Sequence, residues 1–151
     1  MITSIFDPAI RKALILRIQS LNDNSQRQWG KMTVCEMAKH MNNWNEWVLG
    51  KKEGQAYRQD LLGKIFGKLA LRSQTKDNTP MRKGMPAGPH VIKKFSGDLE
   101  MQKKAWIENV EAYANYSNPR FVHDFFGKMT DEQIGIFAYK HADHHLRQFG
   151  V

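Results

Sequence analysis

Two histidines near the end of the sequence, His141 and His145, have a spacing that lets both bind one metal ion. On an α-helix, residues four apart differ in direction by about 40° and lie one turn above each other. Both imidazoles would therefore point to the same place. They continue the apolar stripe of Ile134 and Ala138, which directs them towards the interior of the protein. Because no carboxylate shares that face, two partly buried imidazoles need other partners, and a metal ion is one candidate.

A third histidine, His40, lies in an earlier apolar segment among Met37, Met41 and Trp44. In helix bundles, side chains on facing helices build metal and cofactor sites. Three neutral imidazoles suit zinc, nickel, iron or copper, and they leave at least one position for water or substrate. A lone inward histidine is more often a hydrogen-bonded core residue, so composition and spacing leave a metal site and a structural role equally open.

Two further histidines leave alternatives open. His144 is three residues from His141 and could replace His145, although it is rotated by about 60° to the other side of His141. We therefore expect His145 to face the site. His123, just before the last helical segment, could be a fourth ligand or a proton carrier, but we expect it to be a turn residue.

Four long amphipathic helices are expected to position these histidines. Apolar residues recur at helical spacing, and start signals precede them: Asp7-Pro8, and capping boxes that begin at Thr33 and Thr130. The expected helices run from about 7 to 21, 33 to 50, 96 to 116 and 130 to 150. No alternation of period two persists long enough to predict a strand. The sequence therefore predicts an all-α four-helix bundle with one long crossover, in which residues 1–151 form a single domain.

The crossover is strongly basic. Residues 51–83 include nine basic and three acidic residues, which gives this window +6 of the net charge of +8. Residues 61–71 predict a short basic amphipathic helix, which we expect to cover one end of the bundle without inserting into lipid. A Pro/Gly loop should follow over residues 79–89. We interpret the basic window first as a solvated surface, with binding of anionic substrate, membrane or nucleic acid as alternatives.

Composition limits the class of protein. A chain of 151 residues with 41% hydrophobic and 25% charged residues is typical of one globular domain and not of a disordered segment. No run of about 20 apolar residues predicts a membrane span, and the first residues lack a secretory signal pattern. The single cysteine, Cys35, excludes an internal disulfide framework. We therefore expect a cytoplasmic protein.

Two segments resemble the DinB-like family of metalloenzymes: Trp29-Gly-Lys-Met-Thr-Val-Cys-Glu-Met-Ala-Lys-His40 and His141-Ala-Asp-His-His145-Leu-Arg-Gln148. The resemblance covers nearly the whole chain and points to a branch known only as a domain of unknown function. It implies an up-down four-helix bundle in which His40, from the second helix, and His141 and His145, from the last, hold a divalent metal. Gln148 matches a glutamine that commonly follows the paired histidines.

The resemblance also implies a metal-dependent transferase or hydrolase that acts on a small molecule. Better-known relatives are transferases that use a low-molecular-weight thiol, namely bacillithiol, mycothiol or glutathione, but the basic residues 51–83 and His123 are not part of that signature. We expect zinc or nickel, with iron or manganese as alternatives. A small-molecule substrate is the expected partner, with a thiol as one option; neither membrane nor nucleic acid is expected, and a homodimer stays open. The alternative function is a non-catalytic bundle, with structural metal or none, that binds a partner.

Overall fold

The computed structural model describes residues 1–85, 92 and 94–151, and these residues form five α-helices and one 3₁₀ turn. The elements are α1 Pro8–Ser20, α2 Val34–Val48, α3 Leu61–Thr75, α4 Leu99–Ala112, η1 Tyr113–Asn115 and α5 Asp131–Gln148. Within the described ranges there is no strand, and His123 and Gly127 form an isolated bridge. The prediction of an all-α fold is confirmed. No helix in this part of the chain is long and apolar enough to cross a bilayer.

The two helices that carry the histidines begin at complete capping boxes. In α2, the Thr33 side chain accepts from the backbone N–H of Glu36, and the Glu36 carboxylate accepts from that of Thr33. Thr130 and Gln133 make the same pair of hydrogen bonds at α5. Each box satisfies two backbone N–H groups that have no partner within the helix. The starts of both helices are therefore fixed by local sequence, as predicted.

Two helix boundaries differ from the prediction. The third long helix, α4, begins at Leu99 and not near Ser96, because the Asp98 side chain caps it by accepting from the backbone N–H of Met101. The crossover helix, α3, continues beyond residue 71 to Thr75. Of the predicted Pro/Gly loop, residues 79–85 are irregular, and residues 86–89 lie outside the described residues.

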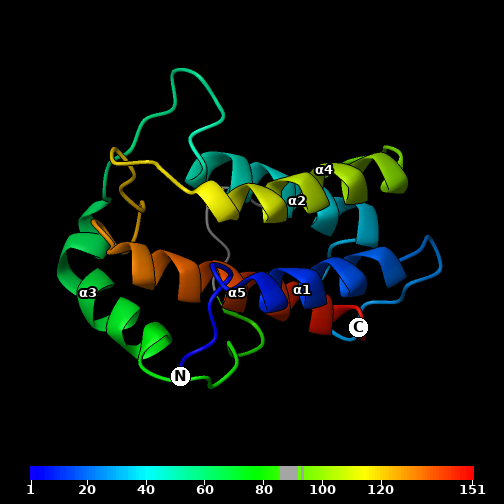
Figure 1. Ribbon diagram of the computed structural model, residues 1–151, viewed down its shortest axis with the longest axis horizontal. Helices are drawn as coiled ribbons and strands as arrows, with labels where there is room; N and C mark the ends of the chain where they lie inside the picture. The colour runs from blue at the N-terminus through cyan, green and yellow to red at the C-terminus, as the bar shows by residue number, and fades with distance from the viewer. Residues whose placement is uncertain (86–91, 93) are drawn as a thin grey trace.

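The helices α1, α2, α4 and α5 pack around one apolar core. Both α1 and α2 contact both α4 and α5. In Figure 1, α1 and α5 lie side by side below α2 and α4. The fully buried core side chains include Leu14, Ile18, Met37, Met41, Trp106, Val110 and Leu146. Because α2 faces α5 across this core, His40 lies on a helix that faces the helix of His141 and His145.

Buried amides join α2 to α4. Asn109 donates from Nδ2 to Oδ1 of Asn42 at 3.2 Å, and the Tyr113 hydroxyl donates to Oδ1 of Asn45 at 2.9 Å. A buried polar group that loses its partner costs about 1–3 kcal/mol. Sliding α2 along α4 would break these hydrogen bonds, so they fix the register of α2. The position of His40 along the bundle is fixed with it.

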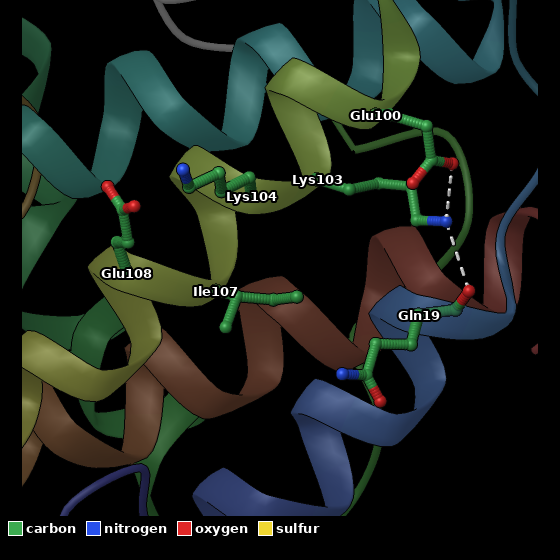
Figure 2. Close-up of a pocket in the computed structure, with 6 residues that line it drawn as sticks. All are labelled: Gln19, Glu100, Lys103, Lys104, Ile107 and Glu108. Carbon is green, nitrogen blue, oxygen red and sulfur yellow. Dashed lines mark hydrogen bonds and ion pairs between the residues drawn. The ribbon is translucent and has the colours of Figure 1, made fainter.

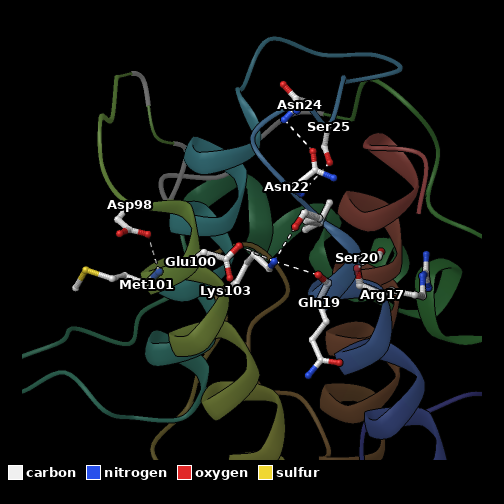
Figure 3. Close-up of polar contacts among 11 residues, drawn as sticks. Arg17, Gln19, Ser20, Asn22, Asn24, Ser25, Asp98, Glu100, Met101 and Lys103 are labelled. Carbon is white, nitrogen blue, oxygen red and sulfur yellow. Dashed lines mark hydrogen bonds and ion pairs between the residues drawn. The ribbon is translucent and has the colours of Figure 1, made fainter.

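Lys103 closes the junction between α1 and α4. Its ammonium donates to the carbonyl oxygens of Gln19 at 3.0 Å and Leu21 at 2.7 Å, and to Glu100 at 2.8 Å (Figure 3). A cation is favoured there because the C-terminal end of a helix carries partial negative charge. A surface pocket of about 450 Å³ adjoins this contact (Figure 2) and is lined by Gln19, Glu100, Lys103, Lys104, Ile107 and Glu108. None of the three candidate histidines lines it.

The helix α3 has its apolar side turned away from the bundle. It contacts α5, and Gly63 and Gly67 lie so close to the carbonyl of Phe125 that a Cβ at either position would clash with its oxygen. The predicted apolar side is exposed by 55–78% and consists of Leu61, Leu62, Ile65, Phe66 and Leu69. The sequence thus predicted the helix, whereas its orientation is set by two glycines that allow close backbone packing.

Candidate metal centre

The structure brings His40, His141 and His145 together between α2 and α5. The Nε2 atom of His141 lies 3.2 Å from Nε2 of His40 and 3.2 Å from Nε2 of His145. One nitrogen from each side chain lies within 4.8 Å of those of the other two. Tetrahedral coordination with metal–nitrogen bonds of about 2.0–2.1 Å separates ligand nitrogens by about 3.3 Å. Two of the three separations match this value, so the three histidines form a group that could hold a metal ion.

Aromatic side chains surround the three imidazoles. Trp44, one turn after His40, packs edge-on against His141 with 4.5 Å between the ring centroids. Phe137, one turn before His141, stacks on the same ring at 6.1 Å. All three histidines are buried, with exposed fractions of 5–8%. The aromatic side chains shield one side of the nitrogen cluster from water, which strengthens electrostatic interactions there.

Burial keeps His141 and His145 neutral. It lowers the pKa of His145 to about 3, with a second contribution from the neighbouring His40. It also lowers the pKa of His141 well below the ordinary value, and His145 and His40 add to the effect. The neutral imidazole is the form that binds a metal. At neutral pH, protons therefore do not compete with a metal for the nitrogens of His141 and His145.

Gln148 determines which nitrogen of His145 carries the proton. Its Nε2 donates to the carbonyl oxygen of Trp29 at 2.9 Å, and its Oε1 lies 2.8 Å from Nδ1 of His145. Because the amide nitrogen is directed to that carbonyl, the amide oxygen faces the imidazole, and Nδ1 must donate. The Nε2 atom of His145 therefore presents a lone pair to the other two histidines.

The loop before α2 holds Gln148 in position. The backbone N–H of Gln28 donates to the Gln148 carbonyl oxygen at 2.7 Å. Gly30 has a φ of +81°, and a Cβ there would clash with the side-chain nitrogen of Gln148. Both the backbone conformation and the close contact therefore require glycine at this position. Through Gln148, residues 28–30 orient His145.

His141 lies between two imidazoles, those of His40 and His145. As a neutral imidazole it carries only one N–H group. A single Nε2–H group cannot point well at both His40 and His145, although both Nε2 atoms lie 3.2 Å away. One cation at the common point would accept all three lone pairs. The donor set thus fits a divalent transition metal.

Nδ1 of His141 has no hydrogen-bond partner among the described residues, so packing against Trp44 and Phe137 orients this ring.

The other two candidate histidines lie outside the cluster. His144 packs edge-on against Trp29, with 5.7 Å between the ring centroids, and burial lowers its pKa. His123 accepts the backbone N–H groups of Phe125 at 3.1 Å and Phe126 at 3.2 Å on its Nδ1. Within the described residues, the group that could hold a metal contains neither of them. His145 thus faces the cluster and His144 does not, and His123 binds the backbone of the turn that follows it; metal binding by His145 stays a prediction.

The hydrogen-bond partner of His145 is the glutamine that the resemblance singles out. Gln148 fills that role, whereas Asp143 forms ion pairs with Arg17 at 2.9 Å and with Arg147 at 2.8 Å. The role of Gly30 was not predicted. Its signal in the sequence, a glycine shortly before a capped helix, is common in loops that have no functional contact.

Comparison with known proteins identifies the family. A sequence model of one family, described as "Protein of unknown function (DUF1569)", matches residues 9–150. Curated proteins and solved structures give no match. The matched range includes both capping boxes and all three clustered histidines. The chain therefore belongs to the DUF1569 family of proteins of unknown function.

Proposed function

We propose that the protein is a metal-dependent enzyme whose ion is bound by His40, His141 and His145. The observation that carries this proposal is the convergence of three Nε2 atoms, two of them 3.2 Å from the third. The hydrogen bond from His145 to Gln148 leaves the lone pair of His145 directed into the cluster. Neutral imidazoles favour borderline divalent ions, so zinc or nickel is proposed, with iron or manganese as alternatives.

We further propose that the chain is a single DinB-like domain over residues 1–151, an up-down four-helix bundle. The pairwise contacts of α1 and α2 with α4 and α5 support this arrangement. The ligands come from the second helix of that set and from the last, as the resemblance implies. On this reading, α3 is an extra helix in the crossover from α2 to α4. A cytoplasmic location belongs to the same proposal; the single cysteine, Cys35, forms no disulfide within the chain.

The proposed reaction class is group transfer or hydrolysis on a small molecule. An ion bound by three imidazoles keeps at least one position for water or a substrate atom, and there it would supply Lewis acidity. The chain contributes the environment of that position. Trp44 and Phe137 exclude water from one side, and Gln148 keeps the proton of His145 on Nδ1.

A basic side chain connected to the cluster through two other residues supports an anionic substrate. The ammonium of Lys83 lies 4.4 Å from the centroid of the Trp29 ring. The carbonyl of Trp29 binds Gln148, which in turn contacts His145. Lys83, in the basic window, is therefore linked to His145 through Trp29 and Gln148. A low-molecular-weight thiol with carboxylate groups would complement this charge, and we propose it as one candidate cosubstrate.

Chelation should leave the helices intact and lower the melting temperature only moderately. The core is apolar and the helices are capped, so the fold does not depend on the metal. Loss of an ion present at a hundred times its Kd removes about 3 kcal/mol of stability, or about 5–10 °C in a chain of this size. Circular dichroism melts with and without chelator measure both quantities.

The same preparation, reloaded with cobalt, tests whether the site is open. Azide or a small thiol should shift the visible spectrum of the cobalt protein, because either can occupy a position that the protein does not fill. An unfolded apo form, or a cobalt spectrum indifferent to added ligand, would make the metal structural and would refute the enzyme proposal.

Gln148→Leu should weaken metal binding by about 10–100-fold, because loss of a hydrogen bond to a ligating histidine typically has this effect. The substitution removes the acceptor that holds the proton on Nδ1 of His145. Competition with a chromophoric chelator measures the affinity. Gln19→Leu, on the surface of α1, is the matched control and should bind the metal as the unsubstituted protein does. Equal affinities for both variants would contradict the role of Gln148.

A further inference from the structure

The exposed apolar face of α3 is the main hydrophobic feature of the described surface that the metal centre does not use. Leu61, Leu62, Ile65, Phe66 and Leu69 follow one another at helical spacing and are exposed by 55–78%. Single exposed apolar side chains are ordinary in proteins, but a contiguous stripe of five indicates an interaction surface.

The orientation of this face is fixed by contacts on the opposite side of α3. Gly63 and Gly67 pack against the backbone of Phe125, whose carbonyl oxygen also accepts from Nε2 of Gln59 at 2.8 Å. At the other end of the helix, Lys140 of α5 donates to the carbonyl oxygen of Gln74 at 2.6 Å. The helix therefore cannot roll to bury its apolar side without breaking these contacts. In Figure 1, α3 lies at the edge of the molecule, across one end of α5.

The charges on α3 are all positive. Lys64 and Lys68 border the apolar stripe along one edge and Arg72 lies in the last turn; all three are exposed, and α3 contains no acidic residue. Beyond the ends of the helix the charge is mixed: Arg58 is exposed near the N-cap Asp60, and Lys76 pairs with Asp77 at 3.9 Å, so the basic border consists of the residues on α3 itself. An apolar stripe with a basic border is typical of helices that lie in the interface of a bilayer. Clustered lysine and arginine side chains complement anionic lipid headgroups.

We propose that α3 docks the protein on anionic membrane surfaces, with its apolar stripe in the headgroup region and its basic side chains on the lipid phosphates. A second copy of the chain fits this face less well, because an antiparallel two-fold contact would place the edges that carry Lys64 and Lys68 side by side. Nucleic acid would leave the apolar stripe in water. The proposal departs from the expectation of no membrane partner because the apolar side faces outward. It does not depend on the metal.

Co-sedimentation with vesicles tests this surface. The protein should bind vesicles that contain phosphatidylglycerol more tightly than pure phosphatidylcholine vesicles. Ile65→Gln/Leu69→Gln should weaken binding at least about tenfold, because two stripe residues lose their apolar contact with lipid. Lys64→Gln/Lys68→Gln should weaken it about fivefold per charge removed. Leu16→Gln/Met101→Gln, which replaces two exposed apolar residues on α1 and α4, is the control and should bind as the unsubstituted protein does.

Three results would overturn the proposal. The first is absence of binding to phosphatidylglycerol vesicles at moderate ionic strength. The second is an equal loss of binding in the Leu16→Gln/Met101→Gln control. The third is a stable dimer in sedimentation equilibrium that Ile65→Gln/Leu69→Gln dissociates, since the stripe would then be an interface between copies. All substituted side chains are exposed, so the variants should fold, and circular dichroism verifies this.

Discussion

His145→Ala is expected to abolish stoichiometric metal binding, whereas His144→Ala is expected to retain about one equivalent. His145 supplies one of three converging Nε2 atoms, and His144 packs against Trp29 outside the cluster. A structural zinc site with four ligands contributes about 10–16 kcal/mol, so loss of one ligand should weaken binding by a factor on the order of 10²–10³. Elemental analysis after purification without a metal-affinity tag, followed by dialysis, measures the metal content.

The pair of variants distinguishes two kinds of error. Each substitution removes one imidazole from α5, at adjacent positions. The two variants therefore lose the same group, but from different faces of the helix. If His144→Ala lost the metal and His145→Ala kept it, the wrong face would have been assigned. If both kept it, or if the unsubstituted protein carried none, the metal centre itself would be wrong.

Trp106→Ala is expected to remove a large part of the folding stability. Trp106 is completely buried in α4, and replacing a buried tryptophan with alanine typically costs about 3–5 kcal/mol through lost burial and the cavity left behind. Domains of this size have a free energy of unfolding of about 5–15 kcal/mol in total. The midpoint of urea unfolding should therefore fall sharply while the slope of the transition stays unchanged.

Met101→Ala is the matched control for this substitution. Met101 lies on the same helix, but 68% of it is exposed, so the change in stability should stay within about 0.5 kcal/mol. A small loss in Trp106→Ala would mean that α4 does not pack as described. A changed slope would mean that the variant no longer unfolds in one step.

The features that the sequence predicts correctly come from contacts between residues that are close together along the chain. Capping boxes bind residues three apart, so Thr33 and Thr130 fix the starts of α2 and α5 without help from the rest of the chain. The convergence of His141 and His145 follows from helix geometry alone. The start of α4 was predicted too early because Ser96 and Asp98 are both capping residues, and only the structure shows which one accepts from the helix.

The features that were not predictable depend on residues far apart in the sequence. An amphipathic pattern shows which side of α3 is apolar, but not which side meets the bundle. Here, Gly63 and Gly67 determine the packing face through Phe125, more than fifty residues later. Likewise, the Gly30 contact with Gln148 spans almost the whole chain. Helical periodicity carries no information about such pairs.

Because Trp44 packs edge-on against His141, indole fluorescence can detect an ion bound at the cluster. Because the ring centroids of Trp44 and His141 are 4.5 Å apart, an ion bound to His141 would be separated from the indole by no more than one imidazole ring. Open-shell ions such as nickel or copper quench indole emission at such distances, whereas zinc, with a filled d shell, has no low-energy electronic states through which to do so. The native fluorescence of the chain should therefore report both occupancy and the electronic class of the bound ion, without an attached label.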